Sequence, residues 1–127
     1  MGTGSAGGGG KEAAGAGAAG IPHSFRNTAA AAATVLTAAG ELLRVLAAPV
    51  RIAIVLQLNE SPCCVHELAE AVRTPQSLVS QHLRILKAAR VVASERAGRQ
   101  VVYRLVDEHL ASIVSAAVVH AAEDPMK

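Results

Sequence analysis

Two short helical patterns separated by a tight polar turn lie in the middle of this chain. The first runs from about Cys64 to Val72, the turn is Arg73-Thr74-Pro75, and the second runs from Pro75 to Ala89 with Thr74 as the expected N-cap. Proline suits the start of a helix because its missing N–H has no intrahelical partner there. Two short helices joined by so short a turn form a helix-turn-helix.

A β-hairpin is predicted directly after these helices. Val91 to Glu95 and Val101 to Val106 are β-branched runs, and Gly98 between them can adopt the positive φ of a hairpin loop. Periodic apolar residues predict three more helices, one from Ala29 through Leu46 and the others at 49–58 and 108–122. We therefore expect a mainly α protein with a small β-hairpin, which is a winged helix-turn-helix.

The fold is expected to occupy only part of the chain. Nine of the eleven glycines fall in the first twenty residues, so we predict a disordered Gly/Ala-rich tail over residues 1–27 and one folded domain over 28–124. Every apolar stretch of about 18 residues contains a charged or helix-breaking residue, and no signal peptide is evident. These features predict a cytoplasmic protein without a membrane partner.

Positive charge is concentrated on the helix-turn-helix and the hairpin. Residues 72–104 hold seven Lys or Arg and one acid, a local charge of 7 − 1 = +6, although the whole chain carries only +2. Such concentration suits neutralisation of DNA phosphates, while a solvated basic face is the simpler alternative. Together with the helix-turn-helix, it predicts a double-stranded DNA partner.

The second helix of the motif carries short hydrogen-bonding groups on the face opposite its expected core face, which consists of Leu78, Val79, Leu83 and Leu86. Groups of that kind read base edges in the major groove, and arginines hold phosphates. His82 borders the apolar face, so it suits a core edge as well as a DNA contact. The predicted DNA-binding residues are Gln76, Ser77, Ser80, Gln81, His82, Arg84, Arg96 and Arg99.

The last helix carries a potential metal-binding residue pair at each end. Asp107 with His109 and His120 with Glu123 have the nitrogen and oxygen ligands that zinc accepts. The two histidines are eleven residues apart, which places them about 20° apart around the helix axis but roughly 16 Å apart along it. One helix therefore cannot close the site.

Two antiparallel copies of this helix would bring the pairs together. Asp107 and His109 of one subunit would then meet His120 and Glu123 of the other, twice, so the spacing predicts a homodimer with two intersubunit zinc sites. Asp107 and His109 converge only if Asp107 lies on the turn before the helix. The alternative is that Asp107 is an ordinary N-cap and that His120 and Glu123 are solvated.

Cys63, Cys64 and Glu67 form a second candidate metal or thiol site. Adjacent cysteines do not make an unstrained disulfide, so reduced thiols are expected. Thiolates there could bind a thiophilic metal or respond to oxidants, but no N-terminal cysteine completes a site. Small buried thiols are the alternative.

Residues from about Leu36 to Glu123 resemble the ArsR/SmtB family of metal-sensing winged-helix repressors, most closely its zinc-responsive SmtB type. The matching motifs are Leu46-Ala-Ala-Pro-Val-Arg51-Ile, Cys64-Val-His-Glu-Leu68, Ser77-Leu-Val-Ser80-Gln-His82-Leu83 and the set Asp107, His109, His120 and Glu123. One departure is Arg90, where the family usually has glycine at the end of the recognition helix.

The resemblance implies a homodimeric repressor that binds operator DNA when metal-free and is released when zinc fills the sites between the C-terminal helices. A winged-helix regulator that senses thiophilic metals or oxidants through Cys63 and Cys64 is the alternative, and a protein-interaction module is a further one. An enzyme is not expected, because no nucleophile and base pair has an orienting partner and four protein ligands leave zinc no open position.

Overall fold

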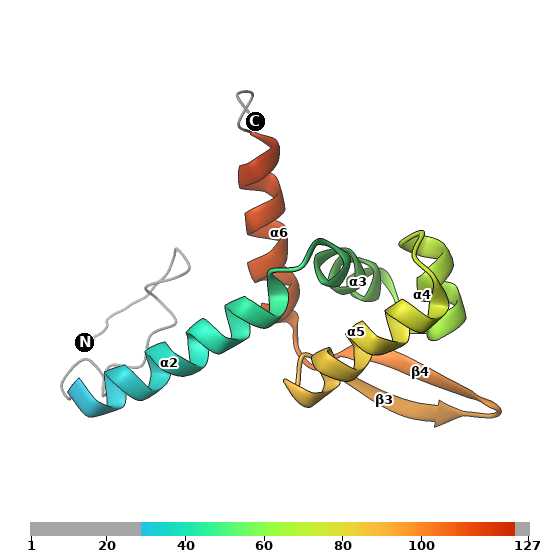
Figure 1. Cartoon of the computed structure of the whole chain (residues 1–127), viewed down its shortest axis with the longest axis horizontal. Coiled ribbons are helices and arrows are strands. Elements are labelled where there is room, and N and C mark those ends of the chain that lie inside the picture. Colours follow the sequence, from blue (N-terminus) through green and yellow to red (C-terminus); the bar gives the residue numbers. More distant parts are fainter. Residues whose placement is uncertain (1–28, 124–127) are drawn as a thin grey trace, which may run out of the picture. The chain divides into compact units, whose positions relative to one another are not determined.

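The computed structural model describes residues 29–123 (Figure 1). The predicted tail, residues 1–27, lies outside the described residues. The chain divides into two compact units, Met1–Ala39 and Gly40–Lys127, and the division falls within helix α2 (Ala29–Leu46). All other described elements belong to the second unit.

Helices α3 (Pro49–Glu60), α4 (Val65–Ala71) and α5 (Gln76–Ala88) follow α2. Pro49 begins α3 as predicted, although the helix continues two residues beyond Leu58. Thr74 is not the N-cap of α5, which was a wrong prediction. Pro75 takes that position, and the Thr74 hydroxyl instead donates to the carbonyl oxygen of Val72 at 3.0 Å.

A three-stranded antiparallel sheet contains the predicted hairpin. Strands β3 (Val92–Ala97) and β4 (Gln100–Leu105) pair through a turn in which Gly98 has φ +67°, as expected. The third strand, β2 (Cys63–Cys64), pairs with β4 in the order β2-β4-β3. The sequence prediction missed β2 and placed Cys64 in a helix, because strand pairing depends on a partner about forty residues away.

The hydrophobic core lies around α3. Ile54 and Val55 of α3 are fully buried, and every helix from α2 to α6 contributes to the same cluster. Leu78, predicted as a core residue, is instead 40% exposed. The buried members of the cluster are Leu46, Ile54, Val55, Leu58, Cys63, Leu68, Val79, Leu83, Leu86, Val91, Val92, Leu110 and Val114.

Helix α6 (Glu108–Ala122) has the bounds that the sequence predicted. Its N-terminal half packs on α3 through Leu110 and Val114, which are 6% and 2% exposed. Its C-terminal half extends beyond α3 (Figure 1), and Val118 and Val119 are 39% and 55% exposed there. The apolar stripe of α6 is therefore covered at one end only.

Helix α2 is long and apolar enough to cross a membrane by length and composition alone. It contains Gly40, Glu41 and Arg44, which interrupt its apolar run. Leu43 is 54% exposed, whereas Leu46 is buried in the core cluster. The C-terminal end of α2 is thus part of the folded unit and also presents apolar surface.

Arginine occupies the left-handed conformation at the ends of α4 and α5. Arg90 has φ +63°, so it adopts the backbone that glycine would adopt more easily, and Arg73 has φ +53°, which the sequence did not reveal. A non-glycine residue in this region costs roughly 1 to 2 kcal/mol. The ends of both helices in the motif are consequently strained.

Removing the side chain of Leu86 tests the core. Leu86 is fully buried, so Leu86→Ala should lower the free energy of unfolding by about 2 to 5 kcal/mol. The neighbouring Ile85 is 40% exposed, so Ile85→Ala should cost under about 1.5 kcal/mol. Urea unfolding of the two variants measures the difference, and equal losses would contradict this packing.

Candidate nucleic-acid interface and metal-binding helix

Helix α5 separates an apolar face from a polar one. Val79, Leu83 and Leu86 are buried, whereas the side chains predicted to contact DNA lie on the exposed face. This arrangement leaves short hydroxyl and amide groups free for base edges in a major groove. The exposed residues of this face are Gln76, Ser77, Ser80, Gln81 and Arg84.

His82 lies at the edge between the two faces of α5 and contacts the rest of the protein. Its Nδ1 accepts a hydrogen bond from Nε of Arg51, on α3, at 3.1 Å. The imidazole must be neutral at Nδ1 to accept this bond. The structure thus gives His82 a structural contact at the core edge, one of the two roles that its position in the sequence allowed.

Arg51 joins three helices. In addition to His82 of α5, it donates from Nη1 to the carbonyl oxygen of Val45, near the end of α2, at 3.0 Å. The planar guanidinium donates in two directions, so it links α3 both to α5 and to the end of α2. Sequence reasoning missed this role, since the contact joins residues 31 positions apart and no local pattern indicates it.

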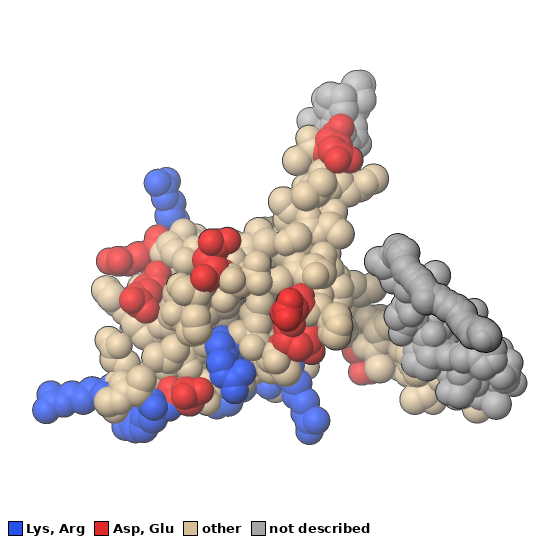
Figure 2. Space-filling view, turned by 180° about the vertical axis from the view of Figure 1, so that it is seen from behind, with Lys and Arg blue, Asp and Glu red and all other residues tan. Residues whose placement is uncertain are grey.

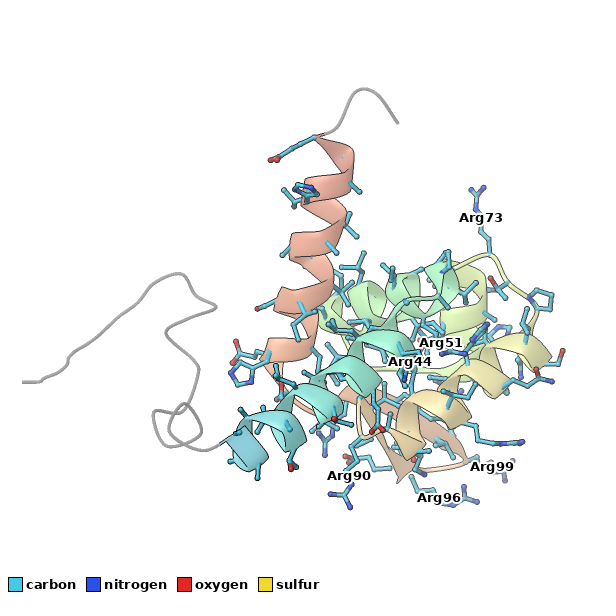
Figure 3. All side chains as sticks on the ribbon, turned by 60° about the vertical axis from the view of Figure 1, so that its left-hand side comes forward. Arg44, Arg51, Arg73, Arg90, Arg96 and Arg99 are labelled. Carbon is cyan, nitrogen blue, oxygen red and sulfur yellow. The ribbon has the colours of Figure 1, made fainter. Side chains whose placement is uncertain are left out.

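The wing carries exposed arginines at its tip. Arg96 and Arg99, predicted to hold phosphates, are exposed on either side of the turn at Gly98. Figure 3 shows Arg90, Arg96 and Arg99 along the lower edge of that view, with Arg90 next to the start of β3 and the other two next to the turn. Arg104 lies farther along β4, where its Nε is 3.5 Å from Oε1 of Glu95.

Positive side chains gather along one edge of the surface. Figure 2 shows most Lys and Arg in the lower part of the view, over the hairpin and the end of α5, and one at the upper left. Most acidic side chains lie above the lower group. Arg104 compensates the negative charge of Glu95, the single acid of residues 72–104. The wing therefore presents its remaining positive charge at the tip.

Asp107 and His109 come together at the N-terminus of α6. Oδ1 of Asp107 accepts a hydrogen bond from the backbone amide of His109 at 2.9 Å and lies 3.3 Å from its Nδ1. The two side chains are 51% and 91% exposed. Asp107 is thus the N-cap of α6, and the same geometry satisfies the condition under which the pair can share a metal ion.

His120 and Glu123 lie at the opposite end of α6, and both are exposed. The structure does not bring them near Asp107 and His109 within one chain. Among residues 29–123, no three His, Cys, Asp or Glu side chains are grouped closely enough to hold a metal ion. A single described chain therefore provides two separate candidate ligand pairs.

Cys63 and Cys64 are buried free thiols, each 5% exposed. Sγ of Cys63 donates to the carbonyl oxygen of Ser61, and the backbone amide of Cys64 donates to Oε1 of Glu67 at 3.0 Å. The hydrogen bond from the Cys64 backbone amide lowers the pKa of Glu67. The Cys64 side chain and the charge of nearby His66 lower this pKa further. Glu67 and Cys64 thus cap the start of α4.

Comparison with known proteins decides the family. The family described as "Bacterial regulatory protein, arsR family" matches residues 48–94, which span α3 to the first wing strand. The HTH-type transcriptional repressor SmtB of Mycobacterium tuberculosis is 71% identical over 90 residues, covering 71% of this chain and 67% of that protein. The chain belongs to the arsR family. This membership confirms the resemblance predicted from the sequence motifs and identifies a transcriptional regulator rather than an enzyme.

Solved structures of other regulators share the fold. The transcriptional repressor BigR from Xylella fastidiosa superimposes with a TM-score of 0.64 at 29% identity, over 72% of this chain and 94% of that one. A homodimeric winged helix-turn-helix DNA-binding domain from Mycobacterium bovis gives 0.66 at 25% identity, over 76% and 90%. The predicted winged helix-turn-helix is therefore confirmed.

The bond between Arg51 and His82 predicts a pH dependence of stability. Burial lowers the pKa of His82 below its usual 6.5, and the charge of Arg51 lowers it further. The unfolded chain then binds more protons, so this contribution to the unfolding free energy is present above about pH 6.5 and is lost as the pH falls through the lowered pKa.

Comparison with His82→Gln tests this dependence. Glutamine can accept the same bond but does not titrate, so the wild type should lose more unfolding free energy than the variant between neutral pH and about pH 5. Urea unfolding at a series of pH values measures the difference. His66→Gln, which removes an exposed histidine of α4, is the control, and parallel wild-type and His82→Gln profiles would contradict the role of His82.

Proposed function

We propose that this protein is a cytoplasmic, homodimeric repressor that binds operator DNA when metal-free and is released by zinc. The sites lie between the C-terminal helices, with Asp107 and His109 from one subunit and His120 and Glu123 from the other. The observation that carries the proposal is the pairing of Asp107 with His109 at 3.3 Å, at the end of α6 opposite to His120 and Glu123.

Uncovered apolar side chains support the homodimer. Val118 and Val119 of α6 and Leu43 of α2 are 39%, 55% and 54% exposed, which is unfavourable unless a second surface covers them. The structural relative from Mycobacterium bovis is described as homodimeric. A second copy packed on α6 would bury this stripe, and it would account for the apolar side chains of α2 without a membrane.

The ligand chemistry supports zinc. Two imidazoles and two carboxylates form a four-ligand set that zinc accepts in tetrahedral geometry, and the closed set suits regulation more than catalysis. Asp107 and His109 are already adjacent and open to solvent. Bound zinc would join the two subunits, because neither ligand pair completes the site alone.

The elements around α6 provide a path from the metal ligands to the DNA-binding surface. Asp107 lies two residues after the end of β4, a strand of the wing, and α6 packs on α3. In turn, α3 packs on α5 and holds it through Arg51 and His82. Fixing α6 against its copy therefore restrains both the wing and the recognition helix.

DNA binding requires the two recognition helices of the dimer to enter successive major grooves. Ser77, Ser80 and Gln81 would contact base edges, with Gln76 beside them on the same face. Arg84, Arg96 and Arg99 would contact phosphates. His82 supports α5 from behind through Arg51. If zinc and DNA favour different subunit arrangements, each weakens the binding of the other by the same factor.

Mixed dimers test the intersubunit ligand set. Asp107→Ser/His109→Ala keeps a capping hydroxyl for α6 but removes one ligand pair, and His120→Ala/Glu123→Ala removes the other. Neither variant has a complete site as a homodimer. A dimer with one subunit of each variant regains one complete site, so we expect it to bind one zinc ion and to be released from DNA by zinc.

Equilibrium dialysis of zinc measures the stoichiometry. Fluorescence anisotropy measures release from a duplex that the wild-type protein selects from a random-sequence library. A mixed dimer that binds zinc no more tightly than its parent homodimers would contradict the arrangement between subunits. Full zinc-induced release of a His120→Ala homodimer at neutral pH would contradict the ligand set itself.

The double variant Cys63→Ser/Cys64→Ser tests the rival sensor. Both thiols are buried and Glu67 is engaged with Cys64, so we expect zinc-induced release to remain within about twofold of the wild type, a difference of roughly 0.4 kcal/mol. Anisotropy titrations with zinc, and with cadmium or peroxide in parallel, measure the response. Loss of every response in this variant, with the fold intact by circular dichroism, would favour the thiol sensor.

A further inference from the structure

Two arginines end the two helices of the helix-turn-helix in the same strained way. Arg73 after α4 and Arg90 after α5 have φ +53° and +63°, and the other positive φ among residues 29–123 belongs to Gly98. Both arginines are exposed. Glycine would adopt this backbone without strain, so the arginine side chains need a separate reason to be there.

The hydrogen bonds identify the same helix-ending motif at both positions. After α4, the amide of Thr74 donates to the carbonyl of Ala69 at 3.1 Å, and the amide of Arg73 donates to that of Glu70 at 3.3 Å. After α5, Val91 donates to Leu86 at 2.9 Å and Arg90 donates to Lys87 at 3.0 Å. This is the Schellman motif, in which the left-handed position is usually glycine.

Contacts within the described chain do not explain why these two positions hold arginine. In residues 29–123, neither guanidinium group makes a hydrogen bond or an ion pair, unlike Arg51 and Arg104, which do. Within the described residues, the hydrogen bonds at these helix ends are made by the backbone alone, and glycine would make them equally well. An external anionic partner would supply the missing interaction.

The positions of the two arginines relative to α5 indicate which anionic partner they would bind. Arg73 lies three residues before the first residue of α5 and Arg90 two residues after the last, and Figure 3 shows them at opposite ends of the motif. The 13 residues of α5 span roughly 20 Å, whereas a major groove is about 12 Å wide. A helix of this length placed across the groove brings its two ends close to the phosphates on the two sides.

We propose that Arg73 and Arg90 are DNA phosphate contacts that anchor the two ends of the recognition helix. The inference rests on DNA binding through α5, and it adds two residues to the predicted interface. Guanidinium groups suit this role because they donate bidentate hydrogen bonds to phosphate. A contact at each end fixes the register of α5 along the groove, while Ser77, Ser80 and Gln81 read the bases.

Three substitutions at each position separate the charge from the backbone strain. Alanine removes the charge but keeps the strain, glycine removes both, and lysine keeps both. We expect Arg73→Gly and Arg90→Gly to raise the melting temperature above that of the wild type and yet to bind DNA more weakly. A residue with a purely structural role would not change stability and affinity in opposite directions.

Salt titration of DNA binding gives the decisive measurement. With a duplex that the wild-type dimer selects from a random library, each Ala or Gly variant removes two phosphate contacts per dimer. The slope of log K against log salt should then become shallower by roughly 1.8, and the lysine variants should retain the wild-type slope. Arg44→Ala, which removes an exposed arginine of α2, is the control and should leave the slope unchanged.

The outcomes distinguish this proposal from the function on which it rests. Glycine variants that bind with the wild-type affinity and slope would overturn the phosphate contacts even though the wild type binds DNA. An equal change of slope in Arg44→Ala would assign the effect to net charge and would also overturn the proposal. A wild-type dimer that binds no duplex at all would contradict DNA binding itself.

Discussion

Burial of one face of α3 is the constraint on which the rest of the structure depends. Ile54, Val55 and Leu58 lie in a single apolar cluster with side chains of the recognition helix α5 and of α6, which carries the proposed metal ligands. Burying an aliphatic side chain contributes about 1.5 to 3 kcal/mol, so these contacts dominate the energetics of so small a unit. They also make α3 the common support of both functional helices, and Arg51 adds a directional bond to His82 that burial alone lacks.

The difference between the packed N-terminal half and the uncovered C-terminal half of α6 follows from the same packing. Leu110 and Val114 are held by α3, whereas Val118, Val119 and the last ligand pair extend past that support. A helix held at only one end can be repositioned by whatever packs against the other end. A metal bound across two subunits would hold both ends of α6. It would also be connected to the wing, because its ligand Asp107 follows strand β4.

Sequence reasoning succeeded where the signal was local. The apolar stripe predicted the bounds of α6, and Gly98 marked the turn of the wing. It failed where the determinant was distant. The strand at Cys63 exists because β4 lies beside it, and Leu78 is exposed because no described element covers that side of α5. The role of Arg51 depends on a helix 31 residues away, and the conformation of Arg73 depends on where α4 ends.

The functional groups of this chain share one property, which is that they are incomplete in isolation. The core cluster of the described residues contains no buried charged or polar side chain, so none of the proposed zinc ligands or DNA contacts is buried in the core. Exposed ligand pairs, uncovered valines and strained arginines are each unfavourable or idle in a single chain. A second copy on α6, an ion between the subunits and a duplex under α5 would satisfy them. Because the same helices link the three proposed surfaces, occupying one would change the free energy of occupying the others.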